Sequence, residues 1–383
     1  MLYKLSDVFD LQMGKTPSRD NNMYWKDGNL PWVSIADLSK SQMYIENSKE
    51  MITNLAAKDT LMKCIPQDTV IMSFKLSLGK IAITKTPLYT NEAIMGFIDK
   101  KLIQIEPKYI YFLFRNIKWG QYTNNAVKGK TLNKKFFSDF QIYIPEYTQQ
   151  TKIASILIRI NKILEYKHFL IKAYDALIKS RFVELFGDID CNTKNWPIIT
   201  LENLAELITD GEHSTPKRCN EGIYLLSARN ILNHSLKLDD VDYIDETEYS
   251  RISKRVIPKA GDILLSCSGS VGRCCVVPLE IKFQLVRSVA LIRFKSEITP
   301  IFAEYMITSD WFQRQINSLK TASSQANLFQ GRIKKLKGFV PDIYLQYEFI
   351  KVVNQINKLK SDVQKTIDET QLLMDSLMQE YFG

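Results

Sequence analysis

One feature constrains this chain more than any other: a long run of helical periodicity that occurs twice. In residues 148–187, apolar side chains recur at alternating spacings of three and four, which places them on one stripe of an α-helix. A matching stripe occupies residues 345–383. A helix of about 39 residues rises about 58 Å, more than an ordinary globular domain needs. We therefore expect the two stripes to pack on each other. The residues predicted to make this packing are Ile153, Ile156, Ile160, Ile171, Tyr174, Ile178, Phe349, Val352, Ile356, Leu359, Ile367 and Leu377.

The connection between the helices predicts their direction. If they ran parallel, the chain leaving Gly187 would have to travel back about the full helix length before the second helix began. Antiparallel packing removes that journey, because the end of one helix then lies beside the start of the other. We expect an α+β chain in which two domains of mixed strands and short helices are joined by antiparallel coiled-coil helices, with approximate two-fold symmetry.

Length and composition agree with two domains in a soluble chain. The 383 residues allow two separate cores, and an apolar content of 45% with 24% charge is ordinary. No apolar run approaches a membrane span and the first residues do not form a signal-peptide core, so we expect a cytoplasmic protein. The predicted boundaries are 1–147 and 188–342 for the domains, with 148–187 and 343–383 for the helices.

Metal and disulfide chemistry are not indicated. The six cysteines are scattered without a C-x-x-C pair, and only three histidines are present. The net charge of +9 lies mainly in the first half of the chain and favours a polyanionic partner.

The two predicted domains repeat one another in order. The matching stretches are residues 4–8 with 200–204, 14–19 with 210–218, 30–38 with 223–231, 65–80 with 257–273, and the polar run before each long helix, 128–133 with 322–328. A duplicated unit of domain plus helix therefore accounts for the whole sequence.

These stretches, in this order and with long helices after each set, resemble the specificity subunit of type I restriction-modification systems. The resemblance implies a chain without catalysis of its own, in which two target-recognition domains each read one half of a bipartite DNA sequence. It also implies that the helices form the spacer and bind methyltransferase subunits, two of them, with restriction and translocase subunits as further partners. The cofactor S-adenosylmethionine is then used by the methyltransferase, and this chain binds none.

Residue type and loop position indicate which side chains meet DNA. Arginine, asparagine and glutamine suit base edges, whereas lysine and hydroxyl groups suit phosphates. The candidates for base edges are Arg218, Arg229, Asn230, Arg273, Gln325 and Asn327, and those for phosphates are Lys15, Lys75, Lys80, Lys128 and Lys130. The remaining DNA-binding candidates are Thr16, Ser18, Arg19, Asn133, His213, Ser214, Thr215, Lys217, Ser270 and Ser324.

The helix length limits the unread DNA between the half-sites. A rod of about 58 Å caps their separation near 17 base pairs, at about 3.4 Å per pair.

Two other classes of function stay open at this point. Asp99 with Glu106 and Lys108 is a nuclease-like fragment that would hold magnesium, but Pro107 interrupts the strand such a site needs. A coiled-coil adaptor for proteins is the other alternative, although aromatic anchors suit it better than loops rich in Lys, Arg, Ser, Gln and Asn.

Overall fold

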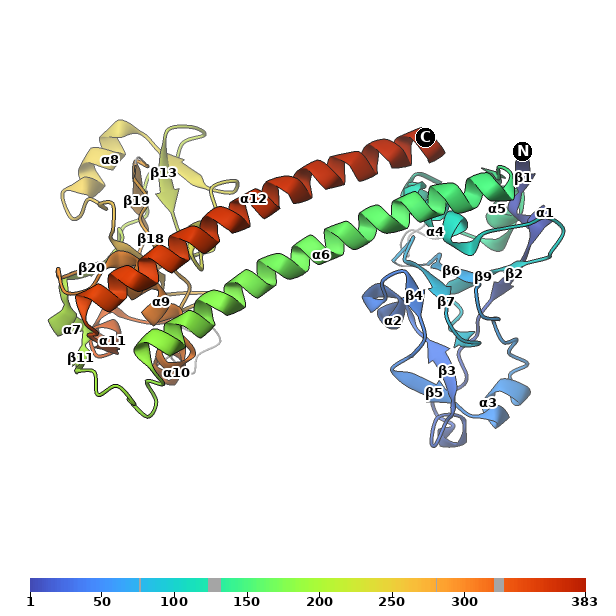
Figure 1. Cartoon of the computed structure of the whole chain (residues 1–383), viewed down its shortest axis with the longest axis horizontal. Coiled ribbons are helices and arrows are strands. Elements are labelled where there is room, and N and C mark those ends of the chain that lie inside the picture. The colour runs from blue at the N-terminus through green and yellow to red at the C-terminus, as the bar shows by residue number, and fades with distance from the viewer. Residues whose placement is uncertain (76, 123–131, 280, 320–326) are drawn as a thin grey trace. The chain divides into compact units, whose positions relative to one another are not determined.

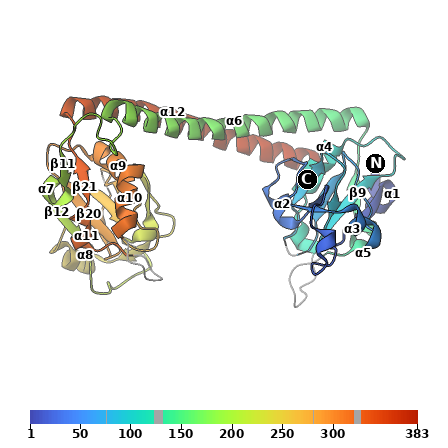
Figure 2. The same cartoon turned by 90° about the horizontal axis from the view of Figure 1, so that it is seen from below.

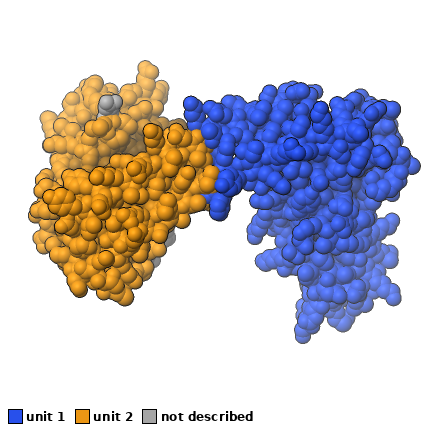
Figure 3. Space-filling model, in the orientation of Figure 1, with its two compact units in different colours: residues 1–169, 364–383 blue, residues 170–363 orange. Residues whose placement is uncertain are grey.

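The computed structural model describes residues 1–75, 77–122, 132–279, 281–319 and 327–383. The chain forms two compact units, drawn in different colours in Figure 3. Unit 1 contains Met1–Phe169 together with Gln364–Gly383, and unit 2 contains Leu170–Val363. Each long helix is therefore shared between the units. The boundaries predicted at residues 147, 187 and 342 follow the helix ends instead and stay predictions.

Unit 1 combines strands and short helices with parts of two long helices (Figure 1). Its elements are β1 (Leu2–Lys4), α1 (Leu5–Val8), β2 (Phe9–Met13), η1 (Asn22–Tyr24), β3 (Leu30–Val33), α2 (Ile35–Lys40), β4 (Tyr44–Ile45), β5 (Glu50–Ile52), α3 (Asn54–Asp59), β6 (Val70–Ser73), β7 (Ile81–Thr84), β8 (Tyr89–Thr90), β9 (Ile94–Asp99), α4 (Pro107–Asn116), η2 (Trp119–Tyr122), α5 (Lys134–Asp139), β10 (Gln141–Tyr143), the start of α6 (Tyr147–Phe186) and the end of α12 (Ile343–Phe382).

Unit 2 has the same kinds of element. They are β11 (Ile198–Thr200), α7 (Leu201–Leu204), β12 (Ala205–Asp210), β13 (Ile223–Leu226), η3 (Ala228–Asn230), β14 (Ile231–Leu232), β15 (Ser235–Leu236), β16 (Asp242–Ile244), α8 (Glu246–Ser253), β17 (Ile263–Ser266), β18 (Cys274–Val276), β19 (Phe283–Leu285), β20 (Val289–Phe294), α9 (Pro300–Thr308), α10 (Asp310–Leu319), α11 (Gln330–Ile333) and β21 (Lys337–Phe339), with the remainder of α6 and α12.

The sheets of the two units share one order of strands. In unit 1 the order β2-β9-β6-β7-β4 accompanies a β5-β3-β8 sheet and a β1-β10 pair. In unit 2 the order β12-β20-β17-β18 accompanies β16-β13-β19 and β11-β21. The middle strands of the three-stranded sheets, β3 and β13, each have one antiparallel and one parallel neighbour. The internal duplication predicted from sequence is therefore confirmed for these shared strands, while unit 1 adds β4 beside β7 and unit 2 adds a β14-β15 pair.

The central strands are apolar because both of their faces are covered. Every residue of β6 and of β17 is buried. In unit 2, Ile263 and Leu265 face a core that includes helix residues of α6 and α12, whereas Leu264 faces a second core on the other side of the sheet. Because successive side chains enter two different cores, these strands are continuous apolar runs and do not alternate between apolar and polar residues.

The two long helices are each 40 residues. The first ends where Gly187 adopts a positive φ of 81°, and the Gly187 N–H donates to the carbonyl of Val183. A left-handed glycine directly after the last helical turn is a common way for a helix to end. No helix in the described part of the chain has the length and apolar content that crossing a membrane requires.

The helices run antiparallel within each unit, as Figures 1 and 2 also show. In unit 1, Lys167 Nζ donates to the carbonyl of Thr366 at 2.9 Å and to Thr370 Oγ1 at 2.8 Å. In unit 2, the Phe182 and Phe349 rings lie 5.4 Å apart, and Lys360 pairs with Asp175.

Most of the predicted packing residues are covered, with one exception. Ile153, Ile160, Ile178, Phe349, Ile356 and Ile367 are buried, and Ile156, Ile171, Tyr174, Val352 and Leu377 are partly buried. Leu359 was wrongly predicted, because 47% of it is exposed. The helical spacing places Leu359 near the stripe but does not tell how wide a stripe the partner helix covers.

Candidate nucleic-acid interface

In unit 1, segments predicted to meet DNA converge on residues 91–94, which are the turn after β8 and the first residue of β9. The Gly14 N–H donates to the Ile94 carbonyl at 3.3 Å, and the Phe74 N–H donates to the Ala93 carbonyl at 2.9 Å. The Leu132 N–H then donates to the Phe74 carbonyl at 3.0 Å. A Cβ at Gly14 would lie 2.1 Å from the Thr90 carbonyl oxygen, so the close approach of the backbone requires glycine.

The same three connections occur in unit 2. The Gly211 N–H donates to Val289 at 3.1 Å, the Cys267 N–H to Ser288 at 2.8 Å, and the Leu328 N–H to Cys267 at 2.9 Å, all at carbonyl oxygens. A Cβ at Gly211 would lie 2.3 Å from the Leu285 carbonyl oxygen. Stretches far apart in the sequence therefore meet in the same way in both units, although the side chains that they carry differ.

A second shared feature shapes the loops after β6 and β17. Ser73 Oγ accepts from the Lys80 N–H at 3.0 Å, and Ser266 Oγ accepts from the Arg273 N–H at 2.9 Å. The loops thereby hold Lys75 and Lys80 in unit 1, and Ser270 and Arg273 in unit 2. Ser270 and Lys80 are exposed, and Lys75 and Arg273 are partly exposed.

In unit 1 the turn at residues 14–19 is tied down by its own candidate side chains. Lys15 Nζ donates to the Thr60 carbonyl at 2.8 Å, and Thr16 bonds Glu92. Arg19 donates from both terminal nitrogens to Glu50, one at 3.0 Å, and its Cζ lies 3.9 Å from the centroid of the Trp25 ring. The pKa of Glu50 lies below its ordinary value, mainly because Arg19 donates to this carboxylate.

The turn at residues 211–218 in unit 2 is held from α8. Glu248 accepts from the Lys217 N–H at 3.1 Å and from Arg251 at 2.9 and 3.0 Å. Arg251 also donates to Ser214 Oγ at 3.2 Å, while His213 contacts Asp210 at 2.9 Å. Ser18 and Thr215, the hydroxyl candidates of the two turns, are exposed.

Two arginines of unit 2 share one carboxylate. Arg218 Nε donates to one oxygen of Asp242 at 3.0 Å, and Arg229 Nη2 donates to the other oxygen at 3.0 Å. About half of each arginine side chain is exposed, at 49% and 48%. Both candidates are thus at the surface in fixed positions.

Asn230 was wrongly predicted to face DNA. It is 1% exposed, its Oδ1 accepts from the Ser227 N–H at 2.9 Å, and its Nδ2 donates to the carbonyls of Lys237 and Asp240 at 2.9 and 2.8 Å. Because the amide is buried and bonded at both ends, Asn230 shapes the turn that carries its neighbour Arg229.

The remaining candidates belong to the polar run before each long helix. Asn133 is exposed and caps α5, accepting from the Phe136 N–H at 2.8 Å. Asn327 is partly buried and forms a β-bridge with Ser268. Lys128, Lys130, Ser324 and Gln325 lie outside the described residues.

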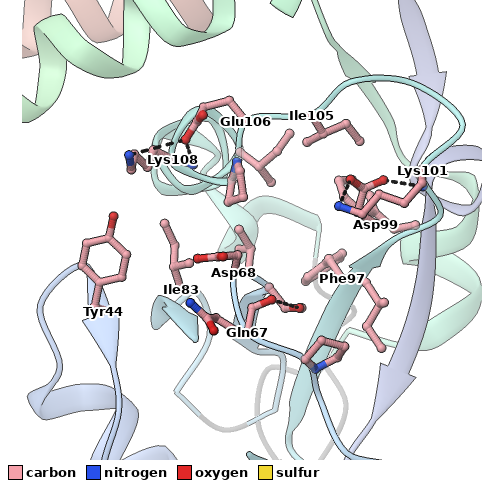
Figure 4. A pocket seen from close by; sticks show the side chains of 17 residues that line it. Tyr44, Gln67, Asp68, Ile83, Phe97, Asp99, Lys101, Ile105, Glu106 and Lys108 are labelled. Carbon is pink, nitrogen blue, oxygen red and sulfur yellow. Dashed lines mark hydrogen bonds and ion pairs between the residues drawn. The ribbon is translucent and has the colours of Figure 1, made fainter. Parts of the chain in front are cut away.

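The nuclease-like fragment lines a pocket of unit 1 with a volume of about 460 Å³ (Figure 4). Each of its carboxylates is paired with lysine: Asp99 with Lys101 at 3.0 Å, and Glu106 with Lys108 at 3.8 Å. Glu106 also caps α4, in which Pro107 is the first residue. Among the described residues, no group of three or more His, Cys, Asp or Glu side chains is placed to hold a metal ion.

Comparison with known proteins agrees with this geometry. Residues 1–172 match the family model described as the type I restriction modification DNA specificity domain. The specificity subunit of the EcoprrI type I restriction enzyme of Escherichia coli is 21% identical over 366 residues, which are 94% of this chain and 88% of that subunit. The chain is thus similar to the specificity subunits of type I restriction enzymes. The MjaIX specificity subunit of Methanocaldococcus jannaschii is 28% identical over 50% of this chain, and the match spans only 42% of that relative.

Solved structures from type I restriction-modification systems share the fold of this chain. The type I S subunit from M. genitalium aligns with 100% of this chain and 96% of its own, at 14% identity and a TM-score of 0.58. A chain from a structural study of the assembly and conformational transition of the type I system aligns with 100% of this chain and 97% of its own, at 14% identity and a TM-score of 0.63. The predicted fold class is confirmed.

Sequence reasoning missed the acidic residues of the candidate interface. It searched the loops for DNA-binding side chains, whereas Glu50, Asp242 and Glu248 lie on neighbouring elements and hold those side chains in place. One feature could have indicated them. Glu50 is the first residue of β5, which pairs with β3, and Asp242 is the first residue of β16, which pairs with the equivalent strand β13.

Proposed function

We propose that this chain selects the DNA target of a type I restriction-modification complex, with each unit reading one half of a bipartite sequence. The observation that supports this function best is the recurrence of one loop arrangement in both units. Backbone bonds hold the turn after β2 and the loop after β6 in the same relation as the turn after β12 and the loop after β17. A backbone arrangement that is the same in both units but carries different exposed side chains suits two domains that read two different half-sites.

In this function the chain carries out no chemistry. Methylation is performed by partner methyltransferase subunits, which use S-adenosylmethionine, and cleavage by restriction subunits. The complex acts where the DNA is, in the cytoplasm.

The long helices support a protein interface in addition to the DNA interface. On α6 within unit 1, Ile163, Tyr166 and Phe169 follow each other at intervals of three, with 47%, 63% and 63% exposed. Exposed aromatic side chains on a helix suit a protein partner better than DNA. The adaptor alternative therefore describes a second part of the same function, in which the helices bind the methyltransferase subunits.

The test is methylation mapping by long-read sequencing. DNA from cells that express this chain with its cognate methyltransferase is compared with DNA from cells that lack only this chain. We expect a bipartite methylated motif that disappears without the chain. If the methyltransferase is active but no motif depends on the chain, the DNA-reading function is wrong and an adaptor function remains.

A further inference from the structure

The strand that opens with Asp242 brings together two arginines from separate segments. Arg218 belongs to the turn after β12, and Arg229 belongs to η3, the short helix after β13. The two guanidinium groups approach opposite oxygens of the Asp242 carboxylate, each at 3.0 Å. Two like charges held this close would repel each other without the carboxylate between them, so Asp242 makes the arrangement possible.

The backbone on both sides fixes the arginines further. Cys219, next to Arg218, forms a β-bridge with Tyr243, next to Asp242. Arg229 lies inside the η3 turn. The Ser227 N–H closes this turn by donating to Asn230 Oδ1 at 2.9 Å. Neither side chain therefore depends on a long flexible loop for its position.

The hydrogen-bond donors of Arg218 are only partly used. It bonds Asp242 through Nε, and among the described residues its terminal Nη1 and Nη2 atoms have no hydrogen-bond partner. Two parallel N–H donors at the exposed end of a fixed guanidinium match the O6 and N7 acceptors of guanine in the major groove. A phosphate contact carries no base information, so its loss weakens binding to all sequences about equally.

The equivalent position in unit 1 is built for a different purpose. Glu50 lies opposite Trp32 of β3, as Asp242 lies opposite Leu225 of β13. Glu50 also binds an arginine of the equivalent turn, Arg19, but it occupies both terminal nitrogens of that guanidinium. A carboxylate at this strand position thus binds an arginine of the neighbouring turn in both units. In unit 2, unlike unit 1, the carboxylate does not bond the terminal nitrogens of that arginine.

We infer that Asp242 is a positioning residue that holds Arg218 beside Arg229 and presents Arg218 to guanine, so that the half-site read by unit 2 contains a guanine in one strand. This inference rests on the proposed function and names the base chemistry of one of its two sites.

The experiment uses the full chain in its methyltransferase complex and maps methylated motifs by long-read sequencing. Arg218→Ala and Arg218→Lys are both expected to relax one G·C position of a single half-site, with discrimination there falling about tenfold or more. The other half-site should stay unchanged. If Arg218→Ala lowers methylation of all targets evenly and relaxes no single position, the contact is a phosphate contact and the inference is wrong.

The Asp242 variants test positioning. Asp242→Asn is expected to relax the same half-site as Arg218→Ala, and Asp242→Glu to keep it, because glutamate retains the negative charge between the two guanidinium groups. Asp239→Asn, which alters an exposed carboxylate nearby, is the matched control. Thermal unfolding separates loss of folding from loss of reading.

The outcomes distinguish the two claims. If the unaltered chain yields no motif, the proposed function fails and the inference fails with it. If it yields a motif whose two half-sites both survive Arg218→Ala, or a motif without a G·C pair in the affected half-site, the function stands and the inference is overturned.

Discussion

At the scale of single residues, the turns predicted to meet DNA are positioned by acidic groups. Glu248 is the clearest case, since it holds both the backbone of Lys217 and the Arg251 guanidinium. The pKa of Glu248 lies below its ordinary value of 4.5, chiefly because Arg251 donates to it, and the pKa of Glu212 is lowered in the same turn, chiefly by Ser214.

These shifts predict how unit 2 responds to acid. A carboxylate whose pKa is lower in the folded than in the unfolded state binds fewer protons when folded, so its contribution is complete above the ordinary value and is lost as the pH falls through the folded pKa. We expect the free energy of unfolding to fall as the pH drops below about 4.5, and Arg251→Gln to weaken this dependence. Urea unfolding between pH 7 and 3 measures it, with Lys254→Gln as the control. Identical acid profiles for the Arg251→Gln chain and the unaltered chain would contradict the assignment.

At the scale of elements, each long helix is joined to its domain by one buried glutamine. Gln150 Oε1 accepts from the Glu106 N–H at 2.8 Å, and its Nε2 donates to the carbonyls of Gln104 and Pro145 at 3.0 and 2.9 Å. Gln346 makes the same set of bonds in unit 2, to Thr299, Glu297 and Pro341. Each amide thus closes the junction between a helix start and the loop before α4 or α9.

Removing this amide should destabilise unit 1. Gln150→Leu leaves the Glu106 N–H and two carbonyls without partners, and each buried unsatisfied group costs about 1–3 kcal/mol. We expect a loss of at least that size in the free energy of unfolding, measured by urea denaturation, together with faster hydrogen exchange in α4. Gln149→Leu, at the exposed neighbouring position, should have little effect. A small effect at both positions would mean that water replaces the lost bonds.

The elements were easier to predict than the contacts that join them. Periodicity and repetition predicted both long helices and the duplication of the domains, because burial on one stripe or on both faces leaves a pattern in the sequence. The buried glutamines left none, since an isolated polar residue has no period. Asn230 and Leu359 were misplaced for a related reason: residue type and spacing do not tell which side chains the neighbouring elements cover.

At the scale of the whole molecule, the length of the shared helices should set the number of unread base pairs. Inserting seven residues between positions 169 and 170 and seven between 363 and 364 adds two turns to each helix without changing contacts inside either unit. The added length is about 10.5 Å, which corresponds to about three base pairs. We expect methylation mapping to show both half-sites unchanged and a spacer longer by about that number.

A matched control carries the insertion in one helix only. It should disrupt pairing of the helices rather than lengthen the spacer, because the registers of α6 and α12 then disagree. An unchanged spacer in the doubly extended chain would show that the helices do not determine the separation.

The division of the chain also affects the order in which it folds. Unit 1 contains residues 364–383, and Phe382 packs its ring 5.3 Å from that of Tyr109. These residues are synthesised only after all of unit 2. Synthesis of unit 1 therefore begins before that of unit 2 but ends after it. Unit 2 is the first unit to have its full sequence outside the ribosome, although folding during synthesis commonly proceeds from the N-terminal domain. Early release of the nascent chain before residue 364 would therefore leave the N-terminal unit incomplete and the C-terminal unit intact.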